Sequence, residues 1–68
     1  MAFCRFVLKP EGGVILHRCR HDETYEEALL ALGINPDTVL VMKGRRSLPI
    51  DEKIEEEEVE ILLTCSRG

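Results

Sequence analysis

Several features that this sequence lacks exclude whole classes of protein. No apolar run approaches the roughly 20 residues that a helix needs to span a bilayer. Residues 1–5 have no basic start followed by an apolar stretch, so they do not form a secretory signal. There is also no phosphate-binding loop and no nucleophile with a nearby base. We therefore expect a cytoplasmic protein that makes no membrane contact, has no catalytic residues and no cofactor of its own, and is not an enzyme.

Cysteines with metal-binding spacing are also missing. Cys4, Cys19 and Cys65 form an odd set without a CxxC pair, which argues against a disulfide scaffold and a zinc knuckle. One alternative remains, because His17, Cys19 and His21 would point to one side of a strand that Cys4 could join from its neighbour. No metal motif has this spacing on a single strand, and Cys19 suits a small core position equally well. We predict no metal site.

The chain is short and acidic. Its 68 residues form one domain with a modest core, since a chain of this size buries only about 60% of its unfolded surface. The net charge of -4, concentrated partly in Glu55–Glu58, argues against nucleic acid as the main partner. The basic residues nevertheless gather in two groups, which leaves room for one basic face. These groups are Arg5, Lys9, Arg18 and Arg20, and Lys43, Arg45 and Arg46.

The first 20 residues predict a β-hairpin. Residues 3–9 alternate apolar and mixed positions as a half-buried strand does, residues 10–13 supply Pro and two glycines for a turn, and residues 14–20 return antiparallel. We expect Lys9 to lie opposite Val14, unless a bulge at the glycines shifts the register by one residue. The further pairs would then be Cys4 and Cys19, Phe6 and His17, and Arg5 and Arg18.

A helix is predicted over residues 24–32. Thr24 and Glu27 have the spacing of a capping box, apolar residues follow at helical intervals, and Gly33 ends the helix. The remaining elements are a turn at 34–37, a strand at 38–42, a short edge piece at 47–49, an acidic turn at 55–58 and a final strand at 59–65.

These elements predict an α+β fold of the ubiquitin-like β-grasp type. The single helix must cover one face of a mixed sheet of four or five strands. The last strand fits in the middle beside the first, where both lose an exposed edge. We expect residues 1–65 to form the domain and residues 66–68 to form a flexible tail.

The second half of the chain resembles a known family. The run 25–45, followed by Leu48-Pro49 and a strand that leads into Ser66-Arg67-Gly68, is similar to the ThiS/MoaD family of ubiquitin-like sulfur carriers, and especially to the archaeal small modifier proteins. The resemblance implies that the protein is a substrate whose terminal glycine, here Gly68, is adenylated by an activating enzyme using ATP. The glycine then becomes a thiocarboxylate through a sulfur donor, or is joined to a lysine of a target protein.

Arg67 departs from the pattern of this family, because its members end in two glycines. Either the channel of the activating enzyme accepts arginine, or the chain continues past Gly68, or the tail is not conjugated. In the last case the protein is a β-grasp interaction module that binds partners without activation. Ser66, Arg67 and Gly68 are the tail residues on which this choice depends.

The sheet face away from the helix is the predicted partner-binding face of a monomer. It would combine an apolar centre with basic neighbours beside the tail. An ordinary solvated sheet face is the alternative. The residues predicted for the partner-binding face are Arg5, Val7, Arg18, Arg20, Leu62 and Thr64.

Overall fold

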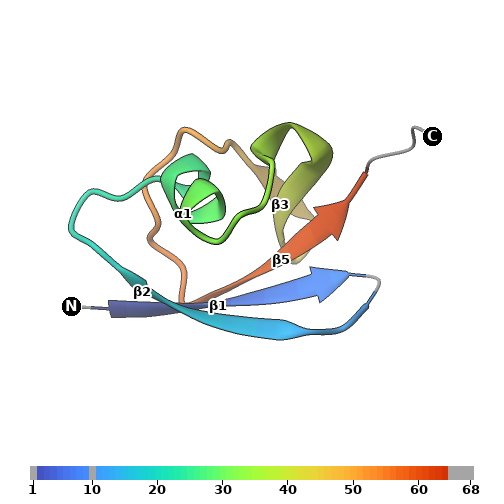
Figure 1. Ribbon diagram of the computed structural model, residues 1–68, viewed down its shortest axis with the longest axis horizontal. Helices are drawn as coiled ribbons and strands as arrows, with labels where there is room; N and C mark the ends of the chain where they lie inside the picture. Colours follow the sequence, from blue (N-terminus) through green and yellow to red (C-terminus); the bar gives the residue numbers. More distant parts are fainter. Residues whose placement is uncertain (1, 10, 65–68) are drawn as a thin grey trace.

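The computed structural model describes residues 2–9 and 11–64 of the chain. Figure 1 shows the only helix of more than one turn in this part, α1, lying on one side of a five-stranded sheet. This arrangement confirms the predicted α+β fold with a ubiquitin-like β-grasp layout. In chain order the elements are β1 (Ala2–Lys9), β2 (Val14–Cys19), α1 (Tyr25–Ala31), the 3-10 turn η1 (Pro36–Thr38), β3 (Val39–Lys43), β4 (Arg46–Leu48) and β5 (Glu58–Leu63).

The sheet is mixed, with the strand order β2-β1-β5-β3-β4. β5 lies in the middle, parallel to β1 and antiparallel to β3, as the sequence predicts for the last strand. Because both neighbours bond to it, β5 has no free edge within the described sheet. The two edges of the sheet are β2 and β4.

The hairpin register differs by two residues from the prediction. Val14 pairs with Val7 rather than Lys9, because the loop closes one residue earlier, at Leu8. The Leu8 N–H donates to the Gly13 carbonyl at 2.6 Å, and the Gly12 N–H donates back to the Leu8 carbonyl. Gly12 has a φ of 85°, a conformation that glycine adopts without steric cost.

The two-residue shift changes the partners of each side chain but not its face. Side chains alternate with a period of two along a strand, so only an odd shift would turn them over. Cys4 therefore pairs with His17 instead of Cys19, and Phe6 pairs with Ile15 instead of His17, yet all of them stay on the helix side. Arg5 pairs with Leu16 rather than Arg18.

The core lies between α1 and the sheet. The largest side chains that are fully enclosed come from α1, β1, β3 and β5, which shows that one face of each contributes to the same cluster. They are Tyr25, Phe6, Leu29, Val41, Val59 and Cys4.

Both ends of α1 follow local sequence signals. Thr24 and Glu27 form the predicted capping box, in which each side chain accepts a hydrogen bond from the backbone N–H of the other. The last helical residue is Ala31, and Gly33 follows with a φ of 79°. At seven residues, α1 is too short to cross a membrane, and no other helix in the described ranges is long and apolar enough to do so.

Candidate functional site

The residue after β5 is fixed to the last residue of η1, directly before β3. Thr64 donates two hydrogen bonds to the carbonyl of Thr38, from its N–H at 2.8 Å and from its Oγ1 at 3.2 Å. The predicted tail residues Ser66, Arg67 and Gly68 lie outside the described residues, as does the predicted domain boundary at residue 65. The described fold therefore provides a firm attachment for the segment that carries them.

The sheet face opposite α1 is uncovered within the described chain, and we call it the open face. Side chains alternate between the two faces of each strand, and one set is buried against α1. The other set therefore belongs to the open face, and the strand register shows which of its members are neighbours. The open face consists of Phe3, Arg5, Val7, Lys9, Val14, Leu16, Arg18, Leu40, Met42, Glu58, Glu60 and Leu62.

Two ion pairs cross the middle of the open face, between β1 and β5. An Arg5 Nη lies 3.1 Å from Glu58 Oε1, and Lys9 Nζ lies 3.9 Å from Glu60 Oε2. All four side chains are partly exposed, so the pairs add little to stability, but they balance the basic charge of β1. Glu58 and Glu60 were not assigned to this face from the sequence. Both lie an even number of residues before Leu62, so their side chains share its face, and a parallel pairing of β1 with β5 brings them beside the basic residues of β1.

Apolar side chains flank these ion pairs on both sides. Phe3, Val14 and Leu16 are 53%, 55% and 63% exposed and lie on β1 and β2. We call these three residues the edge patch. Leu40 and Leu62 form a second group on β3 and β5, nearer the tail.

The structure places four of the six residues predicted for partner binding within the strands of the open face. These are Arg5, Val7, Arg18 and Leu62. Arg20 lies one residue past β2, and its N–H donates to Glu23 Oε1 at 2.7 Å. Thr64 lies one residue past β5, where it bonds to Thr38 at the end of η1 as described above.

Glu23 is a buried carboxylate in the connection between β2 and α1. It is 8% exposed, and His17 Nε2 donates a hydrogen bond to its Oε2 over 3.0 Å. Burial alone raises the pKa of Glu23, but the N–H of Arg20 and the ring of His17 outweigh burial, so the pKa lies below its usual value. This pair fastens the end of β2 to the start of α1.

The alternative metal ligands do not converge. His17 is bonded to Glu23, and the side chain of His21 is 95% exposed. Cys4 and Cys19 are buried in the core, and burial raises the pKa of the Cys4 thiol to about 12. Residues 2–9 and 11–64 contain no group of three or more His, Cys, Asp or Glu side chains placed to hold a metal ion.

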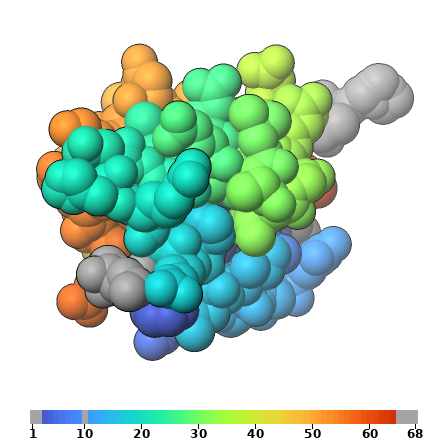
Figure 2. All heavy atoms as spheres, turned by 60° about the vertical axis from the view of Figure 1, so that its left-hand side comes forward, coloured from blue at the N-terminus to red at the C-terminus, as the bar shows by residue number. Residues whose placement is uncertain are grey.

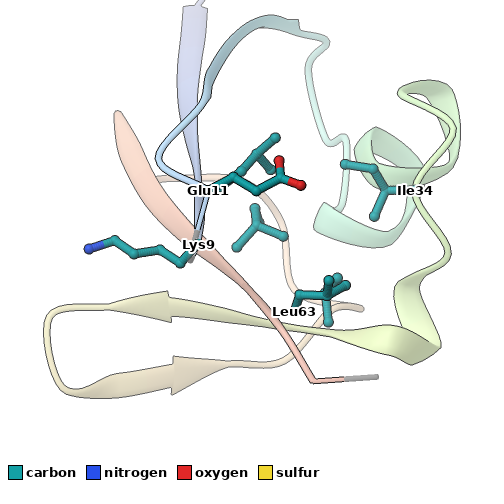
Figure 3. A pocket seen from close by; sticks show the side chains of 7 residues that line it. Lys9, Glu11, Ile34 and Leu63 are labelled. Carbon is teal, nitrogen blue, oxygen red and sulfur yellow. The ribbon is translucent and has the colours of Figure 1, made fainter. Parts of the chain in front are cut away.

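A small apolar cavity opens beside the end of β5 (Figure 3). Its volume is about 150 Å³. Figure 3 shows the Glu11 carboxylate turned toward Ile34 across the cavity, while the Lys9 side chain points away. The remaining lining comes from Leu8, Val39, Ile61 and Leu63.

Comparison with known proteins assigns a family to this fold. The model of the family "small archaeal modifier protein 2" matches residues 10–63. The chain belongs to this family. An uncharacterized protein of Archaeoglobus fulgidus is 41% identical over 46 residues, which cover 68% of this chain and 69% of that protein. The chain is thus a ubiquitin-like small modifier protein, as the resemblance to the archaeal modifiers predicts. The narrower similarity to ThiS and MoaD stays a prediction.

Proposed function

We propose that an activating enzyme adenylates the carboxylate of Gly68 and that the activated glycine then receives sulfur or is joined to a lysine of a target protein. The observation that carries this proposal is the position of β5. It is the central strand of a modifier-family fold, bonded on both sides and tied to Thr38 through Thr64. The domain can therefore hold the tail firmly while an enzyme draws Gly68 into its active site.

The chemistry requires activation because a carboxylate is a poor acyl donor. In the proposed reaction a Gly68 carboxylate oxygen attacks the α-phosphorus of ATP, and pyrophosphate leaves. A sulfide equivalent supplied by the sulfur donor then displaces AMP and leaves a thiocarboxylate. Alternatively an enzyme thiolate displaces AMP, and a target lysine amine displaces that thiolate to form an amide. ATP is used by the activating enzyme, and glycine suits a narrow channel because it has no Cβ.

The open face is the proposed docking surface for the activating enzyme. Its two ion pairs join β1 and β5, and β5, which also carries Leu62, is the strand that the tail follows. Charged side chains of the enzyme would form new ion pairs with Arg5 and Glu58, while its apolar side chains cover Leu62. Arg67 precedes the reactive glycine, so the proposal also requires an enzyme channel that accepts an arginine side chain.

The test is activation of the purified chain by its cognate activating enzyme. We expect ATP-dependent exchange of labelled pyrophosphate and, with a sulfide donor, an intact mass increased by the difference between sulfur and oxygen. A variant that lacks Gly68 should show neither change. Arg67→Gly is the informative companion, because activation of this variant alone would show that arginine prevents the reaction. Absence of exchange with the unsubstituted chain would contradict the proposal, whether or not Arg67→Gly is activated.

The exposed apolar groups of the open face favour one alternative function. A β-grasp interaction module would bind its partners through Phe3, Leu16 and Leu40 without using the tail. Such a protein would keep full affinity for its partners when Gly68 is deleted, and it would never form an adenylate.

A further inference from the structure

The two edges of the sheet differ in how well they are protected from pairing with another strand. β4 has only three residues, begins with Arg46, and is followed by Pro49, which has no N–H to donate. β2 has six residues and contains neither lysine nor proline. Short strands, charges and prolines are the usual means of blocking an edge. β4 is blocked by its length and by Pro49, whereas β2 carries one charge, Arg18, near its end and is open from Val14 to His17.

The direction of the backbone groups in β1 shows which groups of β2 face outward. Leu8 exchanges hydrogen bonds with Gly12 and Gly13, on the β2 side, whereas the N–H of Arg5 donates to Glu57, on the β5 side. These directions alternate along a strand. The backbone groups of Phe6 therefore face β2, as those of Leu8 do.

It follows that Phe6 and its partner Ile15 form a hydrogen-bonded pair. The N–H and C=O groups of Ile15 are thus used within the sheet, and those of the adjacent Val14 and Leu16 point to the free edge. The side chains of these same two residues are more than half exposed. The β2 edge consequently offers unpaired backbone groups and apolar side chains at the same positions.

Charge is distributed unevenly along this edge. Arg18 lies near the end of β2 and Arg20 one residue past it, where its N–H donates to Glu23, whereas Glu11 lies in the loop before β2. Figure 2 shows β2, in light blue to cyan, along the lower front of the molecule below α1, with no other described element covering it. A strand that complements this edge would be acidic beside Arg18 and Arg20.

We propose that the β2 edge binds an extended segment of a partner protein as a sixth, antiparallel strand. The segment would carry apolar side chains at alternate positions, to cover Val14 and Leu16, and acidic residues at its N-terminal end, which antiparallel pairing brings beside Arg18 and Arg20. This interaction requires neither Gly68 nor the activating enzyme, although it shares Arg18 with the docking surface proposed for that enzyme.

Titration of the isotope-labelled full chain with three synthetic peptides, followed by NMR, tests the proposal. The first peptide has the order acidic residues, then alternating valine and threonine; the second has the reverse order; the third has lysine in place of the acidic residues. We expect amide shifts along β2 with the first peptide, weaker binding of the second, weakest binding of the third, and a loss of affinity at high salt.

Two substitutions at Leu16 locate the contact. Leu16→Pro removes an outward N–H and the leucine side chain but no hydrogen bond between β1 and β2, and affinity should fall at least about tenfold. Leu16→Glu retains the N–H, serves if the proline variant fails to fold, and should weaken binding because its carboxylate replaces an apolar contact and repels the acidic segment. Leu40→Glu, on the far side of the open face, is the matched control and should bind normally.

Three results would overturn the proposal. The first is a set of shifts on β3 and β5 instead of β2. The second is undiminished binding to a folded Leu16→Pro variant. The third is self-association of the peptide-free chain in sedimentation experiments that Leu16→Pro abolishes, which would make a second copy the occupant of the edge.

Discussion

The carboxylate of Glu23 is enclosed by the fold with both oxygens hydrogen-bonded. Oε1 accepts from the N–H of Arg20, and Oε2 accepts from His17. The backbone carbonyl of the same residue accepts from the N–H of Ile54 at 2.9 Å. One residue thus connects β2, α1 and the segment before β5. The lowered pKa of this carboxyl makes the connection dependent on pH.

Glu23→Gln should lower the free energy of unfolding by about 1–3 kcal/mol at pH 7, because the amide cannot replace both charged hydrogen bonds. The folded pKa is lowered, so the stabilisation by Glu23 is present above the ordinary pKa of 4.5 and is lost as the pH falls through the folded pKa. Urea unfolding between pH 7 and pH 3 measures both effects. Glu26→Gln, at an exposed position of α1, is the control. An unchanged pH dependence in Glu23→Gln would contradict this account.

At the scale of single elements, the loop between β1 and β2 decides how the hairpin pairs. It closes on Leu8 through hydrogen bonds to Gly12 and Gly13, and Gly12 has a positive φ. Gly13 shows no such constraint, and a Cβ there would meet Leu8 at an ordinary contact distance of 3.7 Å. The two glycines therefore have different importance despite their adjacent positions.

Gly12→Ala should destabilise the protein by about 1–2 kcal/mol, because an alanine side chain disfavours the left-handed conformation. Gly13→Ala should change the free energy of unfolding by less than about 0.5 kcal/mol. Urea unfolding of the two variants under the same conditions makes the comparison. Equal effects at both positions would show that the loop does not depend on the conformation of Gly12.

At the scale of the whole molecule, the sheet has one covered face and one uncovered face. α1 covers the first, and the second combines apolar groups with ion pairs between β1 and β5. The tail follows β5 in the chain, so the strand that contributes Glu58, Glu60 and Leu62 to the uncovered face also precedes the glycine proposed to react. The proposed activation and the proposed strand addition share Arg18 on this surface, but activation uses the tail after β5 whereas strand addition uses the outer edge of β2.

Charge reversal at two positions, Arg5→Glu and Arg18→Glu together, should weaken binding to the activating enzyme by about tenfold or more. Arg5→Glu would also place a second carboxylate beside Glu58, so the centre of the open face would become negatively charged. Calorimetric titration with the enzyme measures the affinity. Arg46→Glu, on the blocked edge β4, is the control. Unchanged affinity of the double variant would remove the open face from the proposed docking.

Much of the local structure could be predicted from neighbouring residues. The capping box of Thr24 and Glu27, the helix end before Gly33 and the face of each side chain in β1 all depend on patterns within a few positions. The ion pair between Arg5 and Glu58 could not be predicted in this way, because its partners are 53 residues apart and meet only through the parallel pairing of β1 with β5.

The sequence by itself determined the α+β fold, the central place of the last strand and the faces of its side chains, since apolar alternation and helix signals act locally. Only the tertiary structure decided the hairpin register, the bonds to Glu23, and the contrast between the open edge of β2 and the blocked edge of β4. These depend on how a loop closes and on which strands become neighbours, and both are settled when distant segments pack around one core.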